Sequence, residues 1–149
     1  MRPSPTVRAA AVAAAALACL LPATGCGKRK KAPLTIEQRL NAALAAPTPV
    51  KQVQELVKVA RLRFKAGDRS GAMTTLSEAR ALVPENGEPS GCGSCFVEIA
   101  GLFAEMGKKV PARENVGKAA AAAAQIGDAA TRAALLAEVA AVQGSKTTG

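Results

Sequence analysis

The chain has 149 residues, of which 49% are hydrophobic, and a formal net charge of +9 at pH 7. This length suits one compact domain. The sequence contains no His, Trp or Tyr and three Phe, so any core must be built from aliphatic side chains, and we expect its cavities to be small and shallow. The missing histidines exclude Ser-His-Asp and Cys-His nucleophilic systems. We therefore expect a protein that is not an enzyme and that uses no cofactor.

Much of the positive charge lies outside the predicted domain. Arg2 and Arg8 lie at the N-terminus and residues 28–31 form a basic run, so without these six residues 14 basic side chains stand against 11 acidic ones. This balance, near +3, is not typical of a nucleic-acid-binding surface. We expect no nucleic-acid partner.

Residues 1–25 are predicted to form a signal peptide. Met1–Arg8 is short and basic, and Ala9–Leu21 is uncharged and apolar. A membrane-spanning helix needs about 20 apolar residues, and this stretch is too short for one. Pro22 follows, and then the motif Ala23-Thr24-Gly25-Cys26.

Small residues directly before a cysteine resemble the bacterial lipobox, in which the thiol is acylated and the chain is cut just before it. The resemblance implies that Cys26 becomes the lipid-bearing N-terminus and that the mature protein is anchored at the cell envelope. Gly27 rather than Asp follows the cysteine, which in lipoproteins favours the outer membrane, on its periplasmic side. Cleavage by the ordinary signal peptidase is the alternative, because Ala23 stands where lipoproteins usually have Leu.

Residues 26–33 are predicted to form a basic tether between the lipid and the domain. The cations of Lys28–Lys31 would lie beside the acylated terminus, where each is attracted to anionic headgroups by about 1 kcal/mol. The alternative is a solvated tether whose charges keep it away from the domain.

From Thr35 onward, apolar residues recur at helical spacing, and the breaks carry helix-capping residues. Thr35 and Gln38 have the spacing of a capping box, and Thr48 before Pro49 is typical of a helix start. We predict helices over residues 35–46, 49–66, 69–83, 93–106, 110–126 and 129–143. Residues 145–149 are predicted to be a disordered tail.

One apolar pattern occurs three times at a spacing of forty residues. Its members are Leu56, Val59, Ala60 and Leu62, then Phe96, Ile99, Ala100 and Leu102, and finally Leu136, Val139, Ala140 and Val142. A period of this length is typical of stacked helix pairs, in which each pair buries its apolar face against its neighbours.

Residues 53–86 resemble a tetratricopeptide repeat, with Gly67 at the turn between its helices and Pro84 closing the unit. Residues 93–126 repeat the pattern, and the helix at 129–143 would begin a third unit and cap the stack. The resemblance implies an all-α fold over residues 34–144, a short right-handed stack of antiparallel helix pairs.

The motif Cys92-Gly93-Ser94-Cys95 is the one pattern that suggests redox or metal chemistry. We expect it in a loop inserted between the two repeats, with Cys95 at the start of the next helix, where the helix dipole lowers a thiol pKa. Zinc would need two further ligands, so no metal site is expected. In an oxidising compartment we predict a local disulfide between the two cysteines, with a redox-active dithiol as the alternative.

Lys58, Arg61, Lys65 and Arg69 form a basic stripe on or just past one helix. The simplest interpretation is a solvated face. The tetratricopeptide resemblance implies that Gln54, Arg61 and Lys65 lie on the concave side, where they would bind an acidic segment of a partner protein.

The sequence thus predicts a lipid-anchored, non-catalytic helical-repeat protein that serves as a protein–protein interaction module at the bacterial cell envelope. Its partner would be another envelope protein, and it would reach the membrane through its N-terminal lipid. The alternative function is that of a thiol–disulfide redox protein that uses Cys92 and Cys95.

Overall fold

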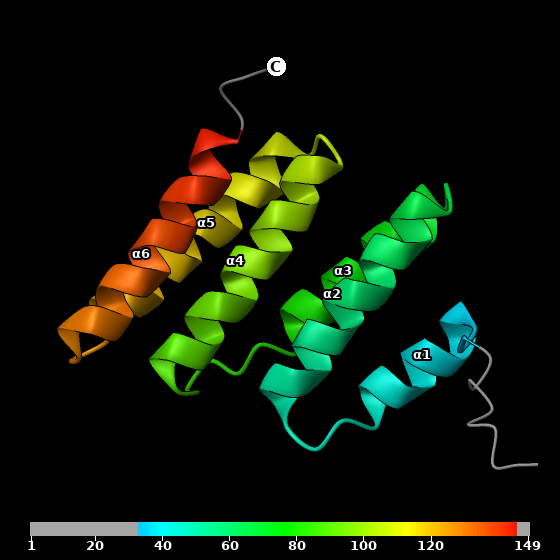
Figure 1. Cartoon of the computed structure of the whole chain (residues 1–149), viewed down its shortest axis with the longest axis horizontal. Coiled ribbons are helices and arrows are strands. Elements are labelled where there is room, and N and C mark those ends of the chain that lie inside the picture. Colours follow the sequence, from blue (N-terminus) through cyan, green and yellow to red (C-terminus); the bar gives the residue numbers. More distant parts are fainter. Residues whose placement is uncertain (1–32, 146–149) are drawn as a thin grey trace, which may run out of the picture. The chain divides into compact units, whose positions relative to one another are not determined.

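The computed structural model describes residues 33–145, and all regular structure within them is helical (Figure 1). The helices are α1 (Ile36–Leu44), α2 (Pro49–Lys65), α3 (Arg69–Ala81), α4 (Pro89–Glu105), α5 (Lys109–Ala124) and α6 (Ala129–Gly144). The predicted all-α fold is therefore confirmed for this part of the chain. The predicted signal peptide, Cys26, the basic run at 28–31 and residues 146–149 lie outside the described residues.

The helices stack in pairs, as predicted. α2 packs against α3 and α4 packs against α5, and the short connections at 66–68 and 106–108 make each pair antiparallel. α4 joins the pairs by packing mainly against α2, with less contact to α3. α1 covers α2 at one end of the stack, and α6 packs against both α4 and α5 at the other (Figure 1).

The turns that follow α2 and α4 are built alike, forty residues apart. Gly67 has φ 86° and Gly107 has φ 73°, a left-handed conformation that glycine adopts without strain. The amide of Gly67 donates to the Phe64 carbonyl, and the next amide reaches back to Arg63. The amides of residues 107 and 108 make the same two bonds to residues 104 and 103. Both helices thus end in a Schellman motif, which reverses the chain and sets each pair antiparallel.

Side-chain caps start most of the helices where the sequence predicts them. Thr35 and Gln38 form the expected capping box. Thr48, the residue before Pro49, accepts a hydrogen bond from the Lys51 amide. Asp68 accepts from the Gly71 amide at the start of α3. Each cap provides an acceptor for an amide that has none within the helix.

The predicted start of α4 was wrong by four residues. We expected the Pro- and Gly-containing segment at 84–91 to be a loop and α4 to begin at residue 93, but it begins at Pro89. Proline is favoured at a first helical position, and Glu88 caps the helix by accepting from the amides of Ser90 and Gly91. The cysteine motif consequently lies inside α4 and not in an inserted loop.

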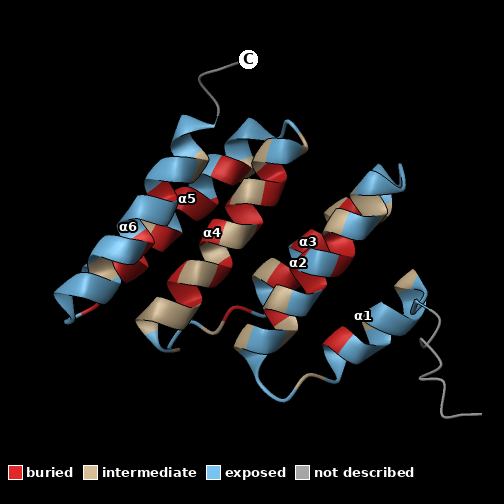
Figure 2. Cartoon of the chain, in the orientation of Figure 1, coloured by how far each residue is buried: buried red, intermediate tan, exposed pale blue. Residues whose placement is uncertain are grey.

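The core consists of two groups of buried side chains that meet at α4. Figure 2 marks the buried residues along the helices. The first fills the space between α1, α2, α3 and α4, and its fully buried large residues include Leu56, Leu76 and Ile99. The second lies between α4, α5 and α6 and includes Val116 and Val139. Because α4 contributes to both groups, it is the central element of the stack.

Candidate functional site

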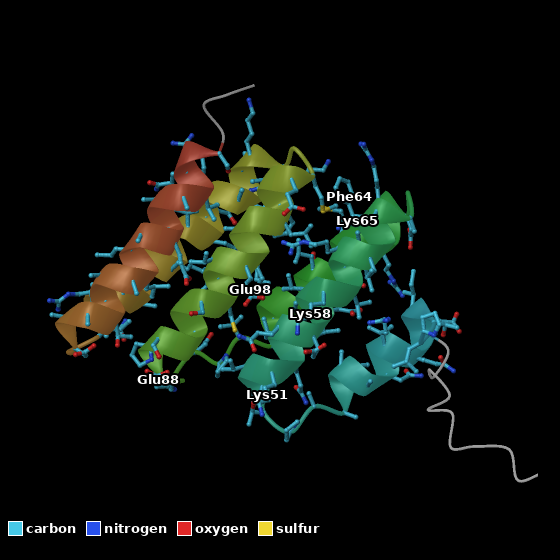
Figure 3. All side chains as sticks on the ribbon, in the orientation of Figure 1. Lys51, Lys58, Phe64, Lys65, Glu88 and Glu98 are labelled. Carbon is cyan, nitrogen blue, oxygen red and sulfur yellow. The ribbon has the colours of Figure 1, made fainter. Side chains whose placement is uncertain are left out.

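The first helix of each unit contributes charged side chains to one shared face of the stack. We call this set the polar face and define it as Glu55, Lys58 and Arg61 of α2, Glu98 and Glu105 of α4, and Glu138 of α6. Figure 3 shows Lys58 and Glu98 on the neighbouring helices α2 and α4. The polar face carries more acidic than basic groups, since four of its six members are glutamates.

Equivalent positions of the repeat align across this face. Lys58, Glu98 and Glu138 are spaced forty residues apart, and the charges of Lys58 and Glu138 both act on the Glu98 carboxyl. Glu98 and Glu138 were not among the residues predicted from the sequence, although the forty-residue spacing of the apolar residues aligns them with Lys58. The repeat therefore orders polar residues on the surface as well as apolar residues in the core.

Arg61 is bound within the protein. Its Nη2 lies 3.2 Å from Glu105 Oε1, and this ion pair joins α2 to α4 across the polar face. The Nε of Arg61 is buried and has no hydrogen-bond acceptor within the described residues. A buried donor without an acceptor costs about 1–3 kcal/mol, so this nitrogen is unfavourable for stability, and it lies beneath the surface.

Glu98 is half-buried at the centre of the polar face. Burial raises the pKa of its carboxyl above the ordinary value, and Glu138 and Glu55 add to that rise, whereas Lys58 and Arg61 oppose it. Lys58 is itself held by Glu55, with Nζ 2.7 Å from Oε1. Glu98 forms no direct ion pair within the described residues, so its negative charge is left for solvent or a partner.

A hollow of about 560 Å³ adjoins the polar face between α4 and α6. Gly101 and Ala141 line it, and Glu105 lies at its edge. Residues 101 and 141 are the repeat equivalents of Arg61, so the hollow arises where a long side chain of the first unit is replaced by glycine and alanine.

The three residues predicted to bind a partner differ in their exposure and ion pairing. Gln54, Arg61 and Lys65 all lie on α2, and helical spacing puts them on one side of it. Arg61 forms an ion pair with Glu105 of α4, and its predicted contact with a partner stays a prediction. Lys65 is exposed near the end of α2 and forms no ion pair within residues 33–145 (Figure 3). Gln54 is half-buried.

The two cysteines are buried in α4 as free thiols, and the disulfide predicted between them stays a prediction. They contact different neighbours. Cys92 Sγ lies 3.4 Å from the Pro84 carbonyl oxygen in the α3–α4 connection, and Cys95 Sγ lies 3.9 Å from that of Val50 in α2. Gly93 is buried against Leu135 of α6, which leaves no room for a side chain. The motif therefore packs α4 against three other segments.

The prediction that the helix dipole lowers the thiol pKa of Cys95 was wrong. Burial raises the pKa of Cys95 to about 12, and Glu98 and Cys92 add to the rise. Burial also raises the pKa of Cys92, with Glu88 contributing in the same direction. Desolvation of a thiolate thus outweighs the helix dipole, and neither sulfur is activated as a nucleophile at neutral pH.

No cluster of three or more potential metal ligands occurs among residues 33–145. In the same part of the chain, no helix has the length and apolar character needed to cross a membrane. Cys26, the predicted lipidation site, lies outside the described residues.

Comparison with known proteins found no matching family model, no matching curated protein and no matching solved structure.

Proposed function

We propose that this chain is a lipid-anchored, non-catalytic helical-repeat protein that acts as a protein–protein interaction module at the bacterial cell envelope. In this proposal Cys26 carries the lipid, the run at 28–31 lies close to the membrane, and tetratricopeptide-like helix pairs present the polar face to a partner envelope protein. The observation that carries the proposal is the alignment of Lys58, Glu98 and Glu138 on α2, α4 and α6, at intervals of forty residues.

The polar face supports a binding role because some of its polar groups are not satisfied within the described residues. The Glu98 carboxyl is half-buried and forms no direct ion pair within the described residues. Buried polar groups are usually paired, so unpaired groups on a surface favour a function in recognition over one in stability. The excess of glutamates favours a partner segment that carries basic side chains, in place of the acidic segment predicted from the sequence.

The thiol–disulfide alternative has no comparable support. Catalytic dithiols need an accessible thiolate, whereas both sulfurs here are buried and have raised pKa values.

Photocrosslinking in intact cells tests the proposal. A photoreactive amino acid at Gln54 or Lys65 should give one discrete adduct with an envelope protein, and the same group at the exposed Glu78 of α3 should not. Glu98→Lys with Glu138→Lys should abolish the adduct by reversing the acidic charge. In a Cys26→Ala variant, the protein should leave the membrane fraction and the adduct should disappear with it.

A charge-swap variant separates loss of recognition from loss of the internal ion pair. Arg61→Glu breaks the pair with Glu105, whereas Arg61→Glu combined with Glu105→Arg restores it with the charges exchanged. If Arg61→Glu abolishes the adduct and the double variant restores it, Arg61 acts by stabilising the fold through its ion pair. If crosslinks form equally from Gln54, Lys65 and Glu78, or survive the Glu98 and Glu138 reversal, the polar face is not the binding surface.

A further inference from the structure

A second and larger cavity lies on another side of the stack. It has a volume of about 670 Å³, within the range of about 300–1,000 Å³ that is usual for small-molecule sites, and it exceeds what the amino-acid composition led us to expect. Its walls come from α3, α4 and α5 and from the connection between α3 and α4. None of the polar-face residues lines it.

The cavity exists because the second helices of the two units do not pack together. α4 fits against α2 but makes little contact with α3, and the backbones of α3 and α5 do not touch. The link between α3 and α5 is an ion pair, in which Arg80 Nη2 lies 3.1 Å from Glu114 Oε2. The connection at residues 82–88 closes one end, where Val83, Pro84 and Gly87 line the cavity.

The lining combines polar and apolar side chains and carries a cation on α5. Phe96 and Phe103, two of the three phenylalanines in the sequence, contribute to it with Val83 and Ala122. Lys118 lies over the ring of Phe96, with Nζ 5.4 Å from the ring centroid. A cation over an aromatic ring gains about 0.5–1 kcal/mol at an exposed site.

Lys118 forms no ion pair with any carboxylate within the described residues, whereas Arg80 on the opposite wall is paired with Glu114. Glu85, in the connection, is the one carboxylate of the lining. The positive charge of Lys118 thus lies beside aromatic and aliphatic side chains. This combination matches a molecule with an anionic head and an apolar body.

We propose that this cavity binds a single-chain amphiphile with an anionic head, in which the head contacts Lys118 and the hydrocarbon chain lies along Phe96, Phe103 and Val83. A carboxylate and a phosphate head share the chemistry that Lys118 would recognise. This site is independent of the polar face and of the interaction proposed there.

Isothermal titration of the full-length protein in detergent-free buffer tests the proposal with four probes. Decanoate should bind, and decyl phosphate shows whether the site also accepts a phosphate head. Hexanoate should bind more weakly, by roughly fourfold for each methylene that the cavity no longer covers. Decyltrimethylammonium has the same chain with a cationic head and should not bind at this site.

Two alanines of α5 provide a matched pair of variants. Both Ala121 and Ala124 are exposed, but only Ala121 lines the cavity. Ala121→Trp should fill the cavity and abolish decanoate binding, whereas Ala124→Trp should retain it. Lys118→Gln should weaken decanoate at least about tenfold by removing the charged contact. Circular dichroism establishes that each variant is folded.

Residues 9–21 are the same in both tryptophan variants, so the difference in decanoate binding between these variants is the decisive readout. The proposal is overturned if decanoate does not bind the wild type. It is equally overturned if Ala121→Trp binds decanoate as tightly as Ala124→Trp does. The same holds if Lys118→Gln binds decanoate as tightly as the wild type does.

Discussion

Single side chains in this protein owe their chemistry to the helices packed around them. Arg61 would be a free cation on an isolated helix, but Glu105 of α4 neutralises it. A place near a helix start would lower the thiol pKa of Cys95, but burial raises it to about 12 and keeps the thiol protonated. In both cases the packing of α4 in the stack changes what the local sequence would predict.

The Cys95 thiol should make stability depend on alkaline pH. In the unfolded chain it ionises around its ordinary pKa of 9.0, but in the folded protein only around 12. Between these values the unfolded state binds fewer protons, so the free energy of unfolding should fall as pH rises, by at most about 1.4 kcal/mol per pH unit. Urea unfolding at pH 8, 9 and 10 measures this slope.

Cys95→Ala is the control for this measurement, because it removes this thiol and leaves every other titratable side chain in place. The variant is less stable overall, but it should lose stability less steeply above pH 9. Identical slopes for the two proteins would show that Cys95 does not titrate differently in the folded and unfolded states.

The individual helices depend on short-range hydrogen bonds at their ends. Asp68 caps α3 through the Gly71 amide, and Asp128 caps α6 through the Thr131 amide. The equivalent residue at the start of α5 is Lys108, which makes no side-chain cap. The third residue of α5 is Pro111, which has no amide hydrogen. A capping side chain at position 108 would therefore lack its usual donor.

Asp68→Ala and Lys108→Ala form a matched pair at these equivalent turns. The first should lower the free energy of unfolding by about 1 kcal/mol, because the Gly71 amide loses its acceptor. The second should change it by less than about 0.5 kcal/mol, since no capping bond is lost. Chemical denaturation of both variants decides between this expectation and equal effects, which would show that the caps do not contribute.

At the scale of the whole molecule, α4 couples the two halves of the stack. It supplies Ile99 and Leu102 to the group of buried residues shared with α1–α3, and Val97 and Ala100 to the group shared with α5 and α6. Repeat stacks gain stability from the interfaces between neighbouring units. With its central helix in both groups, this short stack should unfold in one cooperative transition.

Ile99→Ala tests this coupling. Ile99 is fully buried, so the substitution should lower the free energy of unfolding by about 2–5 kcal/mol. Native-state hydrogen exchange should show protection falling by a similar amount in α2 and in α6. Leu136→Ala, at a side chain of α6 that is 44% exposed, is the control and should have a small effect. Loss of protection confined to one half would contradict the coupling.

The sequence by itself determined the helices, most of their ends and the forty-residue repeat. These features depend on contacts within one or two turns, such as the Thr35–Gln38 capping box, or on an apolar periodicity that is visible along the chain. It failed at the start of α4, because a segment rich in proline and glycine suits a loop as well as a first helical turn. It also did not identify Glu105, the intramolecular partner of Arg61, or the other glutamates of the neighbouring helices.

Only the tertiary structure decided how the helix pairs meet. The pairing of Arg61 with Glu105, the burial of Cys95 and the cavity beside Lys118 all depend on the distance and angle between units. Those quantities result from the summed packing of many side chains far apart in the sequence. Local hydrogen-bond patterns and helical periodicity carry no information about them, which is why the candidate sites emerged from the structure and the helices from the sequence.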